Sequence, residues 1–284
     1  MKSLQDIKNS ISARLFLKRK QLYQKSLQHI NNQTIAFIIG CQRSGTTLML
    51  NIFERDMDVK VYGEKSRLSS LDKEKNIRLN PLPLVKEVLD KDKAPLIVLK
   101  PLVESQHSLK LLNYFARSKA LWMYRHYKDV ARSNLKRFGQ DRGIRNLRPI
   151  VEREPNNWRS ENVPEYIRDI VVEHFSEDMP LHDAASLFWF VRNNFYFELE
   201  LDKNPNVMIY RYNDLVTKPS KMMRSVYKFL GQTYPGDKIL SHVHHSSVGK
   251  GKDVEISPEI EYLCVDMLNR LDAVYQGKEY YIEG

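Results

Sequence analysis

Residues 35–47 read IAFIIGCQRSGTT and specify a strand, a turn and the start of a helix. The apolar half, residues 35–39, predicts a strand buried on both faces, as in a parallel sheet. A glycine-containing turn follows, and residues 46–55 place their apolar side chains at helical spacing. The first N–H groups of a helix have no partner within it, so such a turn can bind an anion. The stretch therefore predicts a loop that binds a phosphate-like group.

The side chains of this turn suit an anion. Arg43 supplies a permanent positive charge and several N–H donors. The neighbouring hydroxyl groups are those of Ser44, Thr46 and Thr47. Gly40 and Gly45 have the spacing of a Walker P-loop, but Thr46 stands where a nucleotide hydrolase has the lysine that reaches the outer phosphates. This difference disfavours a kinase or NTPase, and a strand–turn–helix without a ligand is the remaining alternative.

Composition limits the class of protein. A chain of 284 residues fits one large α/β domain as well as two small ones, and no linker-like segment divides it. The net charge of +10 favours an anionic partner, such as a nucleotide, an acidic glycan, a nucleic acid or a membrane surface. The two cysteines, Cys41 and Cys264, predict neither a disulfide framework nor a metal cluster. The lack of a signal peptide or a long apolar run predicts a soluble, cytoplasmic protein.

The first 33 residues differ from the rest and are predicted to form a basic amphipathic helix, followed by the main domain at 34–284. Its apolar stripe consists of Ile7, Ile11, Leu15 and Leu22. Two interpretations stay open. The helix either packs on the domain with its charged face in water, or makes peripheral contact with a membrane surface.

Further along the chain, short apolar segments alternate with helical patterns. Strands are predicted at 96–99, 120–124 and 207–210. Helices are predicted at 105–117, 130–138, 181–201 and 219–230, the last closed by Gly231. This order favours a single α/β domain with a parallel sheet and helices on both faces, in which ligands bind beyond the carboxyl ends of the strands. The residues that follow predicted strand ends are Arg43, Lys100, Arg125 and Tyr212.

A second pattern occupies residues 124–138, which read YRHYKDVARSNLKRF. Arg125 leaves a strand end, and Ser133 comes about two turns into the following helix. A guanidinium and a hydroxyl group in these positions can hold one phosphate from two sides. Each residue type is common in its place, but the joint spacing behind a buried strand indicates a second anion site.

Three segments together resemble the sulfotransferases that use 3′-phosphoadenosine-5′-phosphosulfate (PAPS). They are GCQRSGTT at 40–47, YRHYKDVARS at 124–133 and IYRYNDL at 209–215. The resemblance covers residues 35–67 and 96–139, and more weakly 207–231. It implies transfer of a sulfuryl group from PAPS to an acceptor hydroxyl without a metal ion. It also implies that the first loop holds the 5′-phosphosulfate and that Arg125 and Ser133 hold the 3′-phosphate.

The family's other functional residues can be assigned by the same resemblance. Arg43 takes the place of the loop cation that neutralises the sulfuryl group, and the residues implied to donate hydrogen bonds are Ser44, Gly45, Thr46 and Thr47. Tyr212 matches a tyrosine near the adenine, although Asn213 replaces the glutamate of the family's YEDL segment. Late cofactor contacts are implied within residues 245–252, HSSVGKGK. The candidates there are Ser246, Ser247, Lys250 and Lys252.

The general base is assigned separately. The cytosolic branch uses a histidine where this chain has Leu102. Glu64, in VYGEKSR, resembles the glutamate of the tyrosylprotein branch, and a surface carboxylate is its alternative interpretation. His107 and His126 stay open as other bases. Lys100 resembles a catalytic lysine that stabilises charge on the sulfuryl group or the bridging oxygen.

The acceptor is left open, as is the oligomeric state. Residues 140–206 match no motif and are predicted to form a loop-rich acceptor wall, except for the helix at 181–201, whose apolar residues, including Phe190, are expected in the core. The basic residues of this wall are Arg142, Arg145, Arg148, Arg153 and Arg159, with Trp158 beside them. A glycan, a peptide tyrosine or a small molecule fits, and no nucleic acid is expected. The alternative functions are a P-loop kinase or NTPase and a non-catalytic nucleotide-binding protein.

Overall fold

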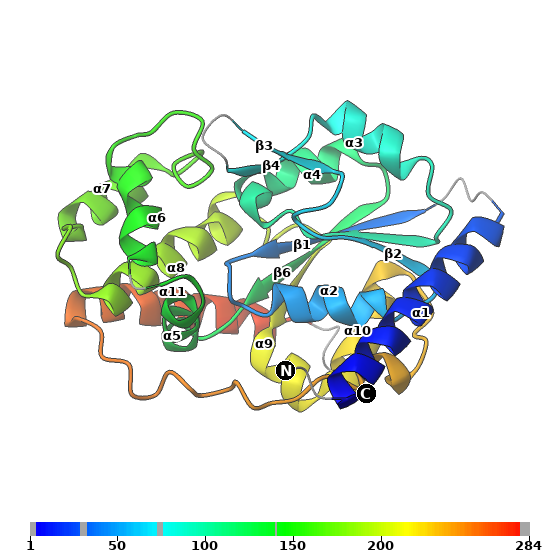
Figure 1. Ribbon diagram of the computed structural model, residues 1–284. Coiled ribbons are helices and arrows are strands. Elements are labelled where there is room, and N and C mark those ends of the chain that lie inside the picture. Colours follow the sequence, from blue (N-terminus) through cyan, green and yellow to red (C-terminus); the bar gives the residue numbers. More distant parts are fainter. Residues whose placement is uncertain (1–3, 29–32, 73–75, 140, 279–284) are drawn as a thin grey trace.

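A five-stranded parallel sheet forms the centre of the protein (Figure 1). The computed structural model describes residues 4–28, 33–72, 76–139 and 141–278. The strands lie in the order β2, β5, β1, β6, β7. Their bounds are β1 (Thr34–Gly40), β2 (Val59–Tyr62), β5 (Leu96–Leu99), β6 (Ser118–Tyr124) and β7 (Val207–Arg211). The predicted single α/β domain with a parallel sheet is confirmed.

Strand β1 lies in the middle of the sheet because nearly all of it is apolar and buried. It pairs in parallel with β5 on one side and with β6 on the other. The register places Phe37 beside Ala120 and Ile39 beside Trp122, so these side chains share one face of the sheet. The anion loop, which we define as residues 40–47, therefore leaves the sheet at its centre.

Helices cover both faces of the sheet. On one face lie α2 (Thr46–Glu54) and α10 (Pro219–Leu230), where the rings of Phe53 and Tyr227 are 5.6 Å apart. The opposite face carries α4 (Ser108–Tyr114), α8 (Leu181–Glu198) and α11 (Pro258–Gln276). There the ring of Trp122 lies 5.4 Å from that of Tyr196 in α8. Phe190 of α8 is 5% exposed, which confirms its expected place in the core.

The remaining elements surround this three-layer core. They are α1 (Leu4–Ser26), β3 (Ser69–Leu71), β4 (Ile77–Leu79), α3 (Leu82–Leu89), the 3₁₀ helix η1 (Leu102–His107), α5 (Tyr127–Phe138), α6 (Arg142–Val151), α7 (Glu165–His174), α9 (Tyr212–Thr217) and the 3₁₀ helix η2 (Asp237–Leu240). The helix predicted at 219–230 is confirmed, and Gly231 ends it with a φ of 69°.

Two predictions about local structure are wrong. The segment 141–180 is not loop-rich, because α6 and α7 account for half of it. Two of its prolines, Pro164 and Pro180, directly precede α7 and α8, where a missing N–H removes no helical hydrogen bond, while Pro149 lies inside α6. The helix predicted at 105–117 is divided into η1 and α4. The hydroxyl of Ser105 donates to the carbonyls of Leu102 and Gly40, which fixes η1 beside the anion loop.

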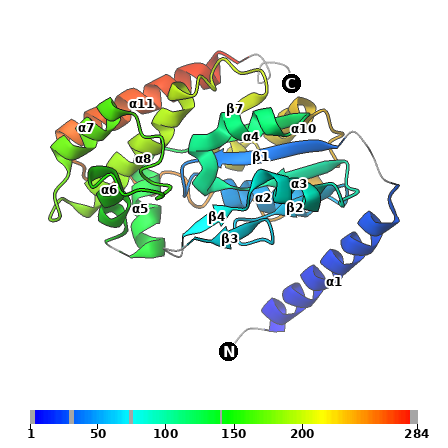
Figure 2. The same cartoon turned by 90° about the horizontal axis from the view of Figure 1, so that it is seen from above.

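Helix α1 lies against the edge of the domain and extends away from it (Figure 2). Its described contacts are polar: Lys20 Nζ donates to the Glu54 carbonyl at 2.6 Å, and Gln24 Nε2 donates to the Met57 carbonyl at 2.9 Å. Leu15 and Leu22 are 62% and 69% exposed, so these two members of the apolar stripe do not pack on the domain. The side chains of Ile7 and Ile11 lie outside the described residues. Nowhere in the described part of the chain is a helix both long and apolar enough to cross a membrane.

Candidate active site

The carboxyl ends of the five strands meet at one edge of the sheet, which we call the rim. In sheet order, the residues that follow β2, β5, β1, β6 and β7 are Glu64, Lys100, the anion loop, Arg125 and Tyr212. The four residues expected at strand ends therefore follow adjacent strands. Strand β2, which the sequence pattern missed, adds Glu64 to the same row.

The anion loop requires its glycines. Gly40 has a φ of 120°, and a Cβ atom there would lie 2.4 Å from the Met123 carbonyl oxygen. Gly45 has a φ of 94°, and its Cβ would lie 2.2 Å from a ring carbon of Tyr212. Side chains are excluded at both positions by backbone strain and by these contacts. Tyr212 thus lies directly against the loop, which ties the end of β7 to the start of α2.

The loop has polar groups that suit an anion. Ser44 is fully buried, and its hydroxyl has no hydrogen-bond partner among the described residues. An unpaired buried hydroxyl is unfavourable unless a ligand pairs with it. Helix α2 begins after Gly45 with no side-chain cap and no acidic residue in its first turn. Its first N–H groups are therefore available to a negatively charged ligand.

Arg43 connects the two sequence patterns. Its Nε donates to the hydroxyl of Ser133 at 3.0 Å, although the two residues are 90 positions apart in the chain. Within the described part of the chain, no carboxylate forms an ion pair with Arg43. Burial, together with the positive charges of Arg137 and Arg125, lowers the pKa of the Arg43 guanidinium. The positive charge of Arg43 is therefore not neutralised by a carboxylate of the described residues.

Lys100 is buried beside the loop and has two partners. Its Nζ donates to Thr47 Oγ1 at 2.9 Å and lies 3.0 Å from Glu64 Oε2. The Glu64 side chain is partly exposed, so its carboxylate is accessible from solvent while Lys100 holds one oxygen. The cation from β5 thus connects the predicted base to the first turn of α2.

Arg125 is buried under the chain that follows η2. Its guanidinium lies 4.4 Å above the ring of Tyr212 and 3.1 Å from a carboxylate oxygen of Asp129. It also donates to the carbonyl of Ser247, whose hydroxyl is hydrogen-bonded to Tyr212. The hydroxyl of Ser133 accepts from Arg43, and the described hydrogen bonds of Arg125 go to Asp129 and Ser247 rather than to Ser133.

Residues 245–252, which we call the late loop, are fixed to α5 by Asp129. Its carboxylate accepts hydrogen bonds from the N–H groups of Gly249 and Gly251 at 3.1 and 2.7 Å. Sequence reasoning assigned no role to this aspartate, although its i+4 spacing from Arg125 was visible. The residues that line the adjacent cavity of about 460 Å³ are His126, Tyr127, Lys128, Asp129, Asn213, Val248, Gly249, Gly251 and Lys252. Ser246 and Lys250 are exposed.

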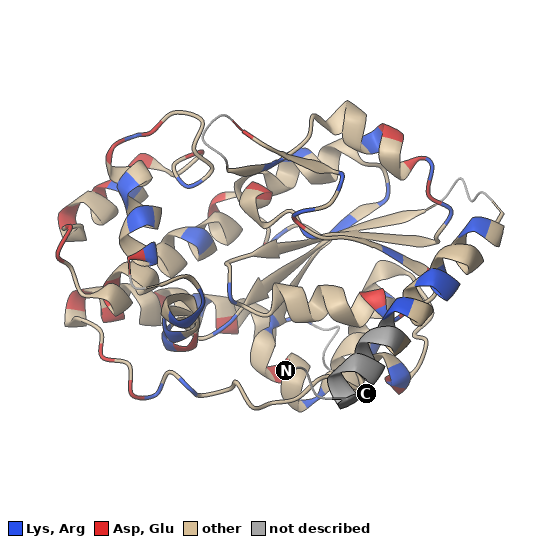
Figure 3. Cartoon of the chain, in the orientation of Figure 1, with Lys and Arg blue, Asp and Glu red and all other residues tan. Residues whose placement is uncertain are grey.

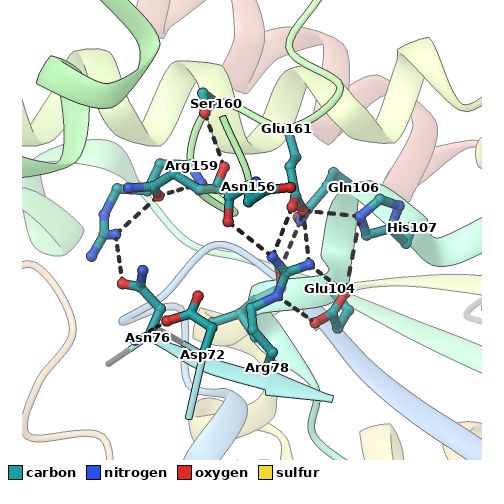
Figure 4. A network of polar contacts seen from close by, with 12 residues as sticks. Asp72, Asn76, Arg78, Glu104, Gln106, His107, Asn156, Arg159, Ser160 and Glu161 are labelled. Atoms are coloured by element: carbon teal, nitrogen blue, oxygen red, sulfur yellow. Dashed lines mark hydrogen bonds and ion pairs between the residues drawn. The ribbon is translucent and has the colours of Figure 1, made fainter. Parts of the chain in front are cut away.

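The two alternative bases lie in other surroundings. His107 Nε2 is 3.1 Å from Glu161, in a network with Arg78 and Glu104 that includes no residue of the anion loop (Figure 4). His126 caps the start of α5 and stacks on Tyr127 with ring centroids 4.6 Å apart. Burial lowers the pKa of His126. Of the three candidate bases, Glu64 is the one whose described contacts include Lys100.

The described residues include no cluster of three or more histidine, cysteine or carboxylate side chains placed to bind a metal ion. That the reaction needs no metal stays a prediction. The charges that face the anion loop come from arginine and lysine side chains instead.

Comparison with known proteins identifies the fold and the family. The structure is similar to the sulfotransferase domain of the olefin synthase from Synechococcus PCC 7002, with 16% identity and a TM-score of 0.53 over 87% of this chain and 98% of that one. It is also similar to the sulfotransferase domain of the curacin biosynthetic pathway, with 16% identity and a TM-score of 0.51 over 86% and 99%. No curated protein sequence matches. Residues 33–269 match the sulfotransferase domain family, and this chain belongs to that family.

Proposed function

We propose that this protein transfers a sulfuryl group from PAPS to a hydroxyl group of an acceptor. The main support is the contact between Arg43 and Ser133, which joins the two predicted anion sites at the centre of the rim. Family membership and the unpaired hydroxyl of Ser44 support the same assignment.

PAPS would supply an activated sulfuryl group attached to a phosphate leaving group. The loop residues proposed to hold its phosphosulfate are Arg43, Ser44, Gly45, Thr46 and Thr47. The residues proposed to hold the 3′-phosphate and the adenosine are Arg125, Ser133, Tyr212, Ser247 and Lys250. Ser247 and Tyr212 already contact each other beside Arg125, which supports their assignment to one subsite. Lys250 is exposed, so its assignment requires its side chain to turn toward the ligand.

Glu64 is the proposed general base. Its carboxylate would accept the proton of the acceptor hydroxyl as the new bond to sulfur forms. Lys100, 3.0 Å from Glu64, would orient this carboxylate and stabilise negative charge on the sulfuryl oxygens together with Arg43. Two cations and the N-terminus of α2 provide the charge neutralisation that a metal ion gives in phosphoryl transfer.

The contact between Lys100 and Thr47 disfavours the P-loop kinase alternative. In a P-loop NTPase, the hydroxyl at the position of Thr47 binds magnesium, and a lysine precedes it in the chain. Here Thr46 replaces that lysine, and Thr47 Oγ1 accepts a hydrogen bond from Lys100 Nζ at 2.9 Å. An ammonium group so close to this oxygen competes with a divalent cation.

Isothermal titration calorimetry with 3′-phosphoadenosine-5′-phosphate (PAP), adenosine 5′-phosphate and MgATP tests this function without knowledge of the acceptor. We expect PAP to bind best. Arg125→Ala should weaken the binding of PAP by about 2–3 kcal/mol, because charge-assisted hydrogen bonds are lost. Arg153→Ala, at an exposed arginine paired with Glu165, is the matched control and should bind PAP normally. Equal affinities for PAP and adenosine 5′-phosphate would reject the donor assignment.

A further inference from the structure

A small basic pocket lies on α6 and the turn that follows it. Its volume is about 240 Å³, and the lining residues are Arg142, Arg145, Arg148, Pro149, Glu154, Asn157 and Arg159. Figure 3 shows several basic positions along α6. We call this cavity the arginine pocket. None of its residues is among those proposed above to hold PAPS or to act in the transfer.

The four arginines of this pocket differ in their partners. Arg145 pairs with Asp141 at 3.1 Å, and Arg148 pairs with Glu177 at 2.6 Å. For Arg142 and Arg159, no carboxylate of a described residue lies within ion-pair distance. Two of the four positive charges are therefore not neutralised by a direct partner.

Arg159 is held in the pocket by neutral groups. It is only 8% exposed, and its guanidinium donates to the side-chain oxygens of Asn146 at 2.8 Å and Asn157 at 3.2 Å. It also donates to the side-chain oxygen of Asn76 at 3.3 Å (Figure 4). The pKa of Arg159 is lowered to about 10, mainly by burial and secondly by the positive charge of Arg142. A buried cation whose partners are amides is unfavourable by itself, and an anionic ligand would relieve that penalty.

The arginine pocket lies close to the anion loop. The guanidinium carbon of Arg43 lies 5.8 Å from the centroid of the Phe138 ring. The guanidinium carbon of Arg142 lies 5.1 Å from the same centroid. The separation of the two guanidinium carbons therefore cannot exceed the sum of these distances. A single acceptor molecule can present a hydroxyl group near Arg43 and an anionic group near Arg142.

We propose that Arg142 and Arg159 bind an anionic group of the acceptor, a carboxylate or a sulfate or sulfonate group. This inference rests on the proposed function, because it concerns the second substrate of the same site. Guanidinium groups bind such anions through paired N–H donors. The small volume admits one such group, and the carboxylate of Glu154 in the wall would repel a polyanion. The acceptor is thus an acidic hydroxyl compound.

The test uses three compounds of nearly equal shape: 4-hydroxybenzoate, 4-hydroxybenzenesulfonate and the neutral 4-hydroxybenzamide. Each is titrated by calorimetry into the full chain saturated with PAP, so that the anion loop is already filled. We expect at least one anion to bind about tenfold or more tightly than the amide. Arg142→Gln should remove this preference, and Arg142→Lys should retain part of it. Arg153→Gln, at an arginine outside the pocket, should leave it unchanged.

The possible outcomes separate this proposal from the proposed function. If PAP binds but the three compounds bind equally, or if Arg142→Gln keeps the preference for anions, the arginine pocket is not an acceptor site. If PAP fails to bind, the donor assignment is wrong. The titration is then repeated without PAP. A preference for the anions that Arg142→Gln removes would support anion binding by the arginine pocket. Equal binding of the three compounds would reject anion binding by the pocket. Arg142 is partly exposed, and the thermal melting of each variant verifies its folding.

Discussion

Lys100 shows how single residues define this site. It is buried at the end of β5, where its ammonium group needs polar partners, and it finds them in Thr47 and Glu64. The same contacts fix the position of the Glu64 carboxylate relative to the anion loop. A catalytic role for Glu64 therefore depends on Lys100 for orientation as well as for charge.

Replacement of Glu64 by glutamine tests its role as the base. Glu64→Gln keeps the size of the side chain and removes its basicity, so PAP should still bind while kcat falls by about 10²–10⁴. Turnover with one working acceptor, together with PAP affinity by calorimetry, gives both quantities. His107→Asn and His126→Asn are the matched variants and should keep their turnover. If Glu64→Gln stays active and a histidine variant does not, that histidine is the base.

At the scale of elements, the joint between β1 and α2 depends on Gly45. Gly45→Ala would place a methyl group against the ring of Tyr212 in a backbone region that alanine avoids. We expect PAP affinity to fall at least about tenfold, because the loop must shift to admit the methyl group. Gly231→Ala is the control: it also has a positive φ, but nothing lies within 4 Å of the added atom. It should reduce stability by about 1–2 kcal/mol and leave PAP binding unchanged. Normal PAP binding by Gly45→Ala would contradict this account.

Helix α8 belongs to the core of the domain. Phe190 is 5% exposed, so Phe190→Ala should lower the free energy of unfolding by about 3–5 kcal/mol. Tyr262→Ala, at a 75% exposed aromatic residue of α11, should change it by less than about 0.5 kcal/mol. Chemical denaturation measures both variants. A Phe190→Ala protein with normal stability and a raised acceptor KM would place α8 at the substrate.

At the scale of the whole molecule, α1 is joined to the domain by a few polar contacts. None of the described contacts of α1 reaches the rim. Removal of residues 1–28 should therefore leave PAP affinity within about twofold and the folded domain intact. Calorimetry and thermal melting of the truncated and full chains provide the comparison. Loss of PAP binding on truncation would show that α1 supports the site. Binding of the full chain, but not of the truncated one, to anionic vesicles would favour the membrane interpretation.

Much of the fold followed from local sequence. The apolar runs predicted the strands β1, β5, β6 and β7, and helical spacing predicted α2, α5, α8 and α10. The parallel arrangement followed from their alternation. These features depend on the spacing of apolar side chains along short segments of the chain, and a single sequence shows that spacing directly. Strand β2 was missed because its four residues include the charged Lys60 and give no apolar run.

The arrangement of the site depended on contacts between distant parts of the chain. Sequence reasoning identified Arg43, Ser133, Lys100 and Glu64, but it gave no contacts among them. The tertiary structure places Ser133 on Arg43, and Lys100 between Thr47 and Glu64. These contacts follow from the strand order β2, β5, β1, β6, β7, which brings separate strand ends side by side. Strand order arises from packing of the whole domain, and no local pattern of residues specifies it.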